Sequence, residues 1–361
     1  MARDIASVGV PKSAPERNGA IDFYRFLFAC IIYILHIRRY GNFDSPNGQF
    51  NGGYLGVEFF FILSGFLMMR NIQSGIEAAG GDSSAEQLTV KYFISRYKKL
   101  MPPYWFYGLT FLVVRKLTDP EYGMKKAFLK GLPDFLGIEV FWRPDHVGGA
   151  LWYVSALLWA SSLIYYLLLK KRNFALYILF PVGILTALGY MYEKIGYIDV
   201  SGNQEMFLSP LLRALAEISL GCIIYCVYQK LSIKRYSTMM MSFLEVGLLA
   251  VVVIVMYRTR RDYKDFIMVF IIGAFILVTM LKQGILTKLL DNKVSVALGA
   301  VSYHLYLSQG IFHHILLQKF PGLPFWPVVL TSLSAAVIFA SVTTAAFKRF
   351  KPRVAVYDLN N

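Results

Sequence analysis

The sequence predicts an all-α integral membrane protein, a polytopic bundle of about ten transmembrane helices. Of its 361 residues, 56% are hydrophobic and 16% are aromatic, and the mean hydropathy is +0.49. That composition is too apolar for a soluble protein with a polar surface. Apolar runs near the length needed to span a bilayer also recur along the whole chain. We therefore expect a multi-pass protein of the cell (plasma or inner) membrane, surrounded by membrane lipid.

The expected spans follow the apolar runs in order. They lie at residues 21–39, 54–71, 102–117, 150–169, 174–192, 210–229, 242–257, 264–281, 295–317 and 325–347. The third is the weakest, because its apolar stretch YWFYGLTFLVV is short. Between the third and fourth spans, MKKAFLKGLPDFLGIEVF has the amphipathic pattern of a helix lying along the interface.

Three parts of the chain are expected from this pattern. They are an N-terminal tail at 1–19, one transmembrane domain at 20–347 and a C-terminal tail at 348–361. The first twenty residues lack an apolar core and a small-residue cleavage site, so no removable signal peptide is expected.

The net charge of +15 could indicate nucleic-acid binding in a soluble protein. Here the Lys and Arg residues form short clusters between apolar runs, such as SRYKK, KKR and KRFKPR, which is the pattern of topology signals. They place both tails in the cytoplasm and give no reason to expect a nucleic-acid partner. The outer segment YRTRRDYK at 257–264 opposes this trend.

Cysteine and histidine usage excludes two further classes of site. The three cysteines, Cys30, Cys222 and Cys226, all fall inside predicted spans, which argues against a disulfide framework. The histidines lack a supporting carboxylate pattern, so no metal site is expected.

The first span carries two polar groups that are costly in lipid, and such groups mark functional sites by default. Arg25 and His36 are eleven residues apart, which is three helical turns plus about 20°, so both side chains face the same direction about 16 Å apart along the axis. With the N-terminus inside, Arg25 lies near the cytoplasmic boundary and His36 in the outer half. The simpler interpretation is that each side chain only reaches the nearest interface.

The second span, GYLGVEFFFILSGFLMMR, carries Glu58 at a depth comparable to His36. A carboxylate beside a histidine can fix the imidazole tautomer and stabilise the imidazolium. Alternatively, Glu58 could pair with any nearby basic group.

The third span begins with ISRYKKLMPPYW, which places Arg96 and Lys99 on one helical face at the level of Arg25. This cluster suits the phosphates of a cytosolic nucleotide cofactor. It equally suits topology signals that contact anionic lipids.

Other polar residues give weaker signals. Arg213 and Glu217 have the spacing of an ion pair along one helix. Trp152 and Ser155, in LWYVSALLW, lie near the outer face, where His313 and His314 are also expected. His304 and Gln309, in SYHLYLSQ, could serve only helix association.

Taken together, these segments resemble the acyltransferase 3 family of integral membrane O-acyltransferases. The resemblance rests on Arg25 and His36 separated by ten residues, then GYLGVEFFFILSGFLM, ISRYKKLMPPYW, LWYVSALLW and SYHLYLSQ. It implies transfer of an acyl group, usually acetyl, from cytosolic acyl-CoA to a hydroxyl of a cell-surface or lipid-linked glycan.

The resemblance also implies roles for individual residues. His36 would be the catalytic histidine, Glu58 the acidic residue of the second helix, and Arg25, Arg96 and Lys99 the groups that bind acetyl-CoA. Trp152 and Ser155 fall in the expected substrate-binding segment.

Three positions depart from the family pattern. Lys99 stands where many members carry a second Arg, the WYVSALL segment lacks the Glu of members that read WTLSxE, and Gln309 stands where many have His. The WYVSALL segment looks more like the branch that acts on exopolysaccharide or cell-surface sugars.

Two other functions fit the residues. A transporter or flippase for a glycolipid or small metabolite would also carry intramembrane charges, although no two-half repeat is visible. A structural subunit of an envelope complex would not need Arg25, His36 or Glu58. The oligomeric state is left open.

Overall fold

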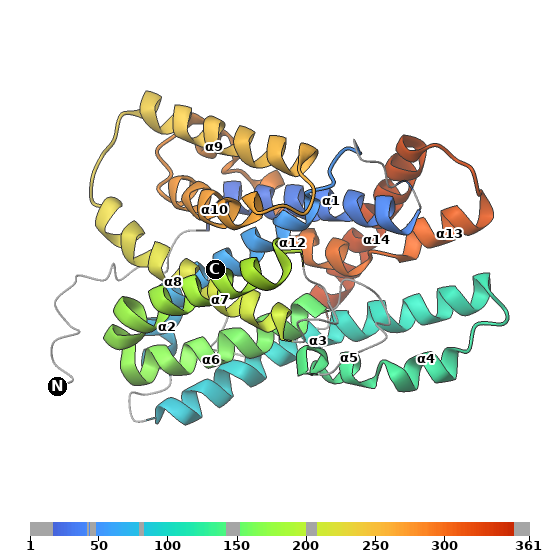
Figure 1. Ribbon diagram of the computed structural model, residues 1–361, viewed down its shortest axis with the longest axis horizontal. Coiled ribbons are helices and arrows are strands. Elements are labelled where there is room, and N and C mark those ends of the chain that lie inside the picture. The colour runs from blue at the N-terminus through green and yellow to red at the C-terminus, as the bar shows by residue number, and fades with distance from the viewer. Residues whose placement is uncertain are drawn as a thin grey trace.

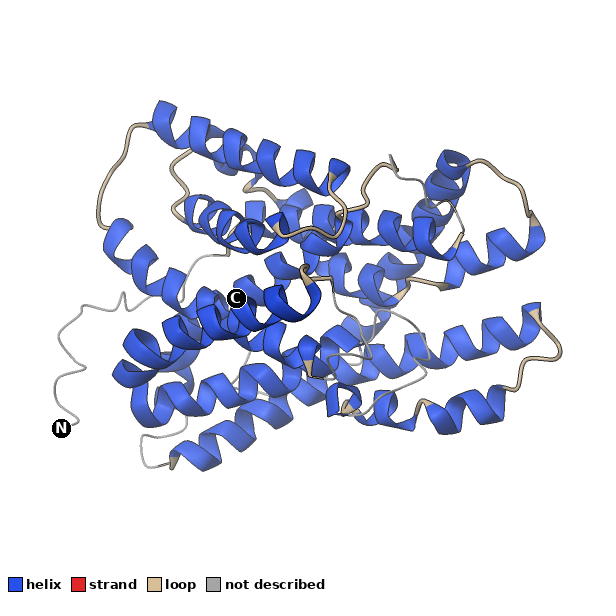
Figure 2. Ribbon diagram, viewed as in Figure 1, coloured by secondary structure: helices blue, strands red, loops and turns tan. Residues whose placement is uncertain are grey.

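The computed structural model describes residues 17–41, 43, 48–78, 83–141, 152–199 and 208–349, and every regular element within them is a helix. Figure 2 shows this helical bundle. The long helices, among them α1, α3 and α9, run roughly along the long axis of the view, with α4 and α13 at one end (Figure 1). The predicted all-α helix bundle is confirmed.

The elements follow in chain order. They are α1 (Gly19–Tyr40), η1 (Gly53–Leu55), α2 (Gly56–Ala78), α3 (Ala85–Thr118), α4 (Met124–Lys130), α5 (Leu132–Leu136), η2 (Glu139–Phe141), α6 (Trp152–Phe174), η3 (Ala175–Leu179), α7 (Phe180–Ile195), α8 (Ser209–Leu231), α9 (Thr238–Arg258), α10 (Lys264–Met280), α11 (Ile285–Leu290), α12 (Lys293–Leu307), α13 (Ile311–Lys319) and α14 (Phe325–Arg349).

Six helical segments among the described residues are long and apolar enough to cross a membrane. They are Gly19–Tyr40, Gly53–Ile72, Trp152–Ile195, Ser209–Leu231, Thr238–Arg258 and Phe325–Arg349. The segment Trp152–Ile195 contains two of the predicted spans, and the non-helical dihedral angles of Lys171 break it between them. The total of about ten spans stays a prediction.

The third predicted span has the wrong beginning. Its helix starts not at Pro102 but at Ala85, because Ser84 and Gln87 form a reciprocal capping box there. Both prolines lie inside a helix of 34 residues, which at 1.5 Å per residue is about 50 Å long and exceeds the bilayer core.

The ninth predicted span is also wrong as one helix. Gly310 has a φ of 93°, which L residues rarely adopt, and it separates α12 from α13. The predicted interfacial segment, residues 124–141, forms the short elements α4, α5 and η2.

Two glycines let α2 and α8 pack backbone to backbone. A Cβ atom added at Gly65 would overlap the carbonyl oxygen of Ile218, and one added at Gly221 would overlap that of Ile62. Close approach through small residues is the common device of helix packing in membranes. This contact fixes the helix that carries Glu58 against the helix that carries Arg213.

We expect Gly65→Ala to lower the thermal stability of the purified protein, because the added methyl group forces the two backbones apart. Overpacking of this kind costs about 1–3 kcal/mol. The matched control is Gly183→Ala, since no atom lies within 4 Å of a Cβ added there. Equal melting temperatures for the two variants would contradict this account of the contact.

Candidate functional site

His36 lies in the last turns of α1, and we call this end of the bundle the His36 end. Its Nδ1 lies 2.8 Å from the carbonyl oxygen of Ile32. A carbonyl oxygen can only accept, so Nδ1 carries the proton and Nε2 keeps its lone pair. Among the described residues, Nε2 has no hydrogen-bond partner, so it can accept a proton from a bound molecule.

An aromatic stack covers one side of His36. The rings of His36 and Tyr40 have centroids 5.9 Å apart, and Tyr40 stacks in turn on His313 from α13 at 5.4 Å. His313 is only 3% exposed, so it packs inside the bundle, and its predicted level near the outer face stays a prediction. Its burial follows from packing between Tyr40 and Tyr33, which contacts it edge-on.

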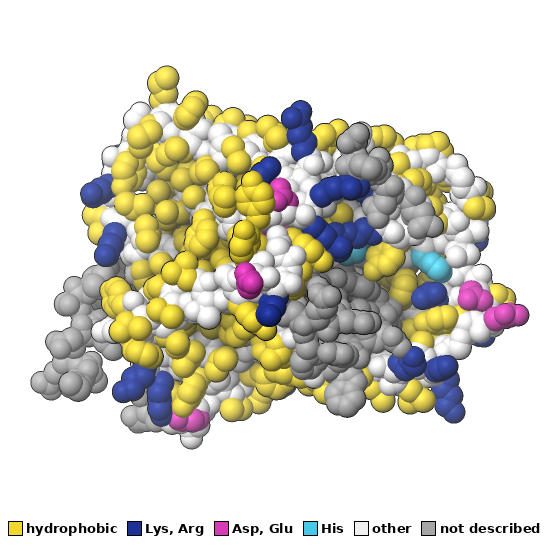
Figure 3. Space-filling model, in the orientation of Figure 1, with side chains coloured by type: hydrophobic (Ala, Val, Ile, Leu, Met, Phe, Trp, Pro, Cys, Tyr) yellow, Lys and Arg dark blue, Asp and Glu magenta, His cyan; other side chains and the backbone are white. Residues whose placement is uncertain are grey.

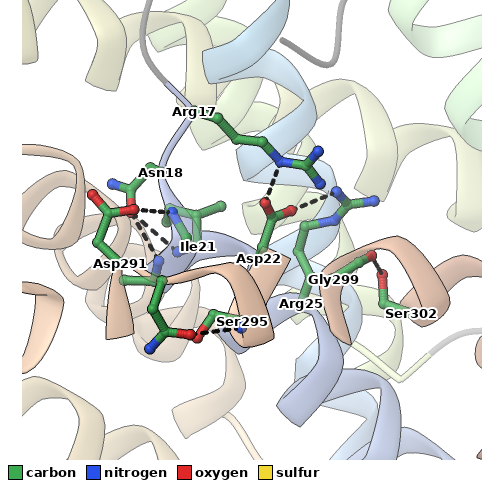
Figure 4. Close-up of polar contacts among 12 residues, drawn as sticks. Arg17, Asn18, Ile21, Asp22, Arg25, Asp291, Ser295, Gly299 and Ser302 are labelled. Carbon is green, nitrogen blue, oxygen red and sulfur yellow. Dashed lines mark hydrogen bonds and ion pairs between the residues drawn. The ribbon is translucent and has the colours of Figure 1, made fainter. Parts of the chain in front are cut away.

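Arg25 lies near the opposite end of α1, which we call the Arg25 end. Arg25 and Arg17 both pair with Asp22, at 3.2 and 2.6 Å (Figure 4). The start of the helix is fixed by Asn18, whose side chain accepts hydrogen bonds from the first backbone amides, and by Asp291, which accepts from the Gly19 amide. These contacts hold Arg25 at the rim of the bundle.

A small pocket of about 40 Å³ opens beside Arg25. Its lining includes three arginines, Arg17, Arg25 and Arg70, and one carboxylate, Asp22. The pocket is the size of a single anionic group, and Arg is the side chain best suited to phosphate geometry. Arg70, at the end of the quoted segment GYLGVEFFFILSGFLMMR, was not singled out by the sequence because one terminal Arg is an ordinary topology signal.

Arg96 and Lys99 are half-buried on α3 and are not among the residues that line this pocket. The Arg96 guanidinium lies 5.6 Å from the centre of the Tyr92 ring. The charges of Arg25 and Arg96 both act on the Tyr153 hydroxyl. The pocket itself joins Arg25 to Arg17 and Arg70.

Glu58 has one of the two partners expected for it. Its carboxylate pairs with Arg213 at 2.5 Å, and Arg213 reaches Glu217 at 3.5 Å. All three side chains are at most 1% exposed. Of the two partners predicted for Glu58, the structure therefore shows a basic group, Arg213, and not His36, and the predicted Arg213–Glu217 pair is confirmed.

The substrate-binding role of Trp152 and Ser155 stays a prediction, and both side chains have internal partners. Arg213 lies over the Trp152 ring at 5.4 Å. The Ser155 hydroxyl donates to the Gly137 carbonyl at 2.9 Å and accepts from the Val140 amide at 3.2 Å. Trp152 therefore holds Arg213, and Ser155 holds the chain between α5 and η2.

Within the described residues, no cluster of His, Cys, Asp and Glu could hold a metal ion. His304 and Gln309 are both buried. His304 lies edge-on to Tyr107 and contacts Phe347, so it packs among aromatic rings of α3 and α14.

Comparison with known proteins supports the resemblance seen in the sequence. The family model described as an acyltransferase domain matches residues 18–347, which is nearly the whole chain. Neither the curated proteins nor the solved structures gave a match. The chain therefore belongs to the acyltransferase 3 family of membrane acyltransferases.

Proposed function

We propose that this protein transfers an acyl group, acetyl in our proposal, from cytosolic acyl-CoA to a hydroxyl of a cell-surface or lipid-linked glycan. The Arg25 end would face the cytoplasm and the His36 end the outside of the cell membrane. The observation that carries the proposal is α1 itself. One unbroken helix joins an arginine-lined pocket at its start to a histidine with an available Nε2 near its end.

The donor would bind at the Arg25 end. Arg25, Arg17 and Arg70 fit a phosphate group of acyl-CoA in their pocket, with Arg96 and Lys99 on α3 as further cations for the remaining phosphates. The distance of about 16 Å from Arg25 to His36 is comparable to the reach of an extended pantetheine arm. The thioester would thus lie near His36 while the phosphates stay at the rim.

The chemical step needs one proton acceptor and one acyl carbon. In direct transfer, His36 Nε2 takes the proton from the acceptor hydroxyl while the hydroxyl oxygen attacks the thioester carbonyl carbon. The carbon–sulfur bond then breaks, and the imidazolium returns the proton to the leaving thiolate. In a covalent relay, Nε2 attacks the carbonyl carbon and the carbon–sulfur bond breaks, which releases the CoA thiolate. The acceptor hydroxyl oxygen then attacks the acyl carbon, the bond from that carbon to Nε2 breaks, and the hydroxyl proton passes to the thiolate or to water.

Glu58 takes a different role in this proposal from the one that the sequence suggests. The Ile32 carbonyl, one turn earlier on the same helix, already orients His36. Glu58 does not contact His36 in this proposal. Its ion pair with Arg213 stabilises the packing of α2 against α8. Glu58 is a positioning residue.

The test of this function is consumption of radiolabelled acetyl-CoA by the purified protein in nanodiscs, with crude envelope glycan as the acceptor. We expect release of CoA and transfer of label to the glycan. No binding and no turnover under these conditions would overturn the proposal and favour the transporter.

Arg70→Gln should raise the KM for acetyl-CoA about ten-fold and leave kcat nearly unchanged, because a charge-assisted contact to phosphate is worth about 1.5–3 kcal/mol. The matched control is Lys230→Gln, an exposed cation in the last turn of α8. A higher KM in Arg70→Gln than in Lys230→Gln supports binding of the donor phosphate in the pocket. The same KM in both would contradict its role in donor binding.

A further inference from the structure

The His36 end also carries a cluster of arginines that the catalytic proposal does not use. Arg39, one turn beyond His36, and Arg261, in the turn between α9 and α10, both pair with Asp199. The Arg261 contact measures 2.8 Å. Arg39 follows His36 by three residues on α1, so this network lies at the same end of the helix as His36.

Both guanidiniums are held in place and remain accessible. Arg39 lies 5.8 Å from the centre of the Tyr54 ring, and Arg261 lies 5.2 Å from that of Tyr197. The side chains of Arg39 and Arg261 are 27% and 50% exposed, whereas that of Asp199 is 4% exposed. Both guanidiniums are therefore partly accessible to a ligand.

The charge balance at this place is positive. Burial raises the pKa of Asp199, but the charges of Arg39 and Arg261 outweigh it and hold that pKa below its usual value. Asp199 is therefore ionised, and one carboxylate between two guanidiniums leaves one positive charge. The chain from Arg258 to Asp265 carries four cationic side chains, Arg258, Arg260, Arg261 and Lys264, against two carboxylates, the half-buried Asp262 and the buried Asp265. Figure 3 shows Lys and Arg side chains gathered near the middle of one face, close to a histidine.

These arginines have no simple role in topology. If the His36 end faces outside, as the proposed function requires, Lys and Arg in the turn at 258–264 oppose the positive-inside rule. An arginine cluster kept on the disfavoured side needs another use. The paired fork of Arg suits an oxyanion, either a carboxylate or a phosphate.

The neighbouring Tyr40 adds a surface suited to a sugar. Its ring stacks on His36 and is 52% exposed. Because its ring also stacks on His313, the part of Tyr40 that a saccharide can reach is the ring edge and the hydroxyl, which can exchange a hydrogen bond with a sugar hydroxyl. The ring, the catalytic nitrogen and the arginines thus lie next to one another at one rim.

From this geometry we propose that the acceptor is an anionic saccharide, whose carboxylate or phosphate binds Arg39 and Arg261 while its hydroxyl lies at His36. The inference rests on the proposed function, and it names the class of acceptor. A negatively charged sugar would be drawn to this rim before it binds.

Binding of three probes to the protein in phosphatidylcholine nanodiscs tests the inference. The probes are a hyaluronan tetrasaccharide, which carries glucuronate, chitotetraose, which is neutral, and N-acetylglucosamine 1-phosphate. We expect one or both anionic probes to bind at least about ten-fold more tightly than chitotetraose, with the advantage lost at high salt. The relative affinities of the two anionic probes show whether carboxylate or phosphate is preferred.

Arg260→Gln/Arg261→Gln should weaken binding of the preferred anionic probe about ten-fold. Lys125→Gln/Lys126→Gln removes the same charge from exposed side chains of α4 and should leave binding unchanged. Melting temperatures check that both variants fold. The inference would be overturned if chitotetraose bound as tightly as the anionic probes, or if both double variants weakened binding equally.

The outcome is separable from that of the proposed function. Acetyl-CoA consumption that depends on His36, with no preference for anionic probes, would overturn only the acceptor class. A preference for anionic probes that requires Arg261, without any acetyl-CoA consumption, would overturn the transferase and leave an anion-binding rim.

Discussion

Replacing His36 with alanine should abolish acyl transfer and leave the protein folded. Both chemical routes pass through Nε2 of His36. The hydrogen bond from Nδ1 to the Ile32 carbonyl leaves the lone pair of Nε2 available for either route. Loss of a general base lowers the rate by about 10²–10⁴-fold, and loss of a covalent relay lowers it further. The measurement is label transfer from radiolabelled acetyl-CoA in nanodiscs, together with the melting temperature.

The matched control for this variant is His314→Ala. His314 belongs to the same end of the bundle, but its Nε2 lies 3.0 Å from the Thr118 hydroxyl and it is not part of the Tyr40 stack. It should retain transfer. Full activity in His36→Ala would remove this histidine from the mechanism.

Acid quenching during turnover separates the two routes. Label that stays on the wild-type protein and is absent from His36→Ala would indicate the acyl-histidine relay. A wild-type protein without label, at full turnover, would indicate direct transfer.

Arg213→Met should strongly destabilise the protein. The change leaves Glu58 and Glu217 buried together without the guanidinium between them, and it removes the hydrogen bond to the Tyr54 carbonyl at 3.2 Å. Removing one partner of a buried ion pair costs about 3–5 kcal/mol. The expected result is a large fall in melting temperature in detergent.

Two further variants separate charge from geometry. Arg213→Lys keeps the positive charge, but a lysine ammonium lacks the planar fork with which the guanidinium contacts Glu58 and Glu217 through different nitrogens. An intermediate melting temperature is therefore expected. Glu58→Gln/Arg213→Met/Glu217→Gln removes all three charges and should recover part of the loss, because the penalty arises from the unpaired carboxylates. Wild-type stability in Arg213→Met would contradict this account of the cluster.

The hydrophobic pattern predicted the helical class correctly, because lipid requires every spanning segment to satisfy its own backbone hydrogen bonds. The positions where individual helices begin and end were harder to predict from the sequence. The helix that starts at Ala85 begins in a polar segment, so hydropathy alone placed its start at the prolines. Gly310 lies within an apolar run, so nothing in the run's composition marked the break between α12 and α13.

The sequence predicted those relations within the site that involve two residues of the same helix. Arg25 and His36 belong to the same unbroken helix, and helical geometry fixes their relation. The Arg213–Glu217 pair was visible for the same reason. Asp22, three residues from Arg25, had the spacing of its ion pair and could have been found by the same argument.

Contacts between helices could not be found in this way. Spacing along one helix says nothing about which neighbour Glu58 faces, and its pairing with Arg213 depends on the close packing of α2 against α8. The same holds for Arg70 in the pocket of Arg25 and for His313 in the stack of His36.

The sequence by itself determined that this protein is a helical membrane protein of the acyltransferase 3 family, and that Arg25 and His36 share one helix face. The membrane class and the shared face follow from apolar length and helical period, which are local, and the family follows from the motifs that the chain shares with it. Only the tertiary structure decided that Glu58 belongs to Arg213, that Ser155 holds a neighbouring segment, and that Arg39 and Arg261 meet at Asp199. These pairs join residues up to 160 positions apart. Burial of charge forces such groups to find partners wherever helix packing brings them together.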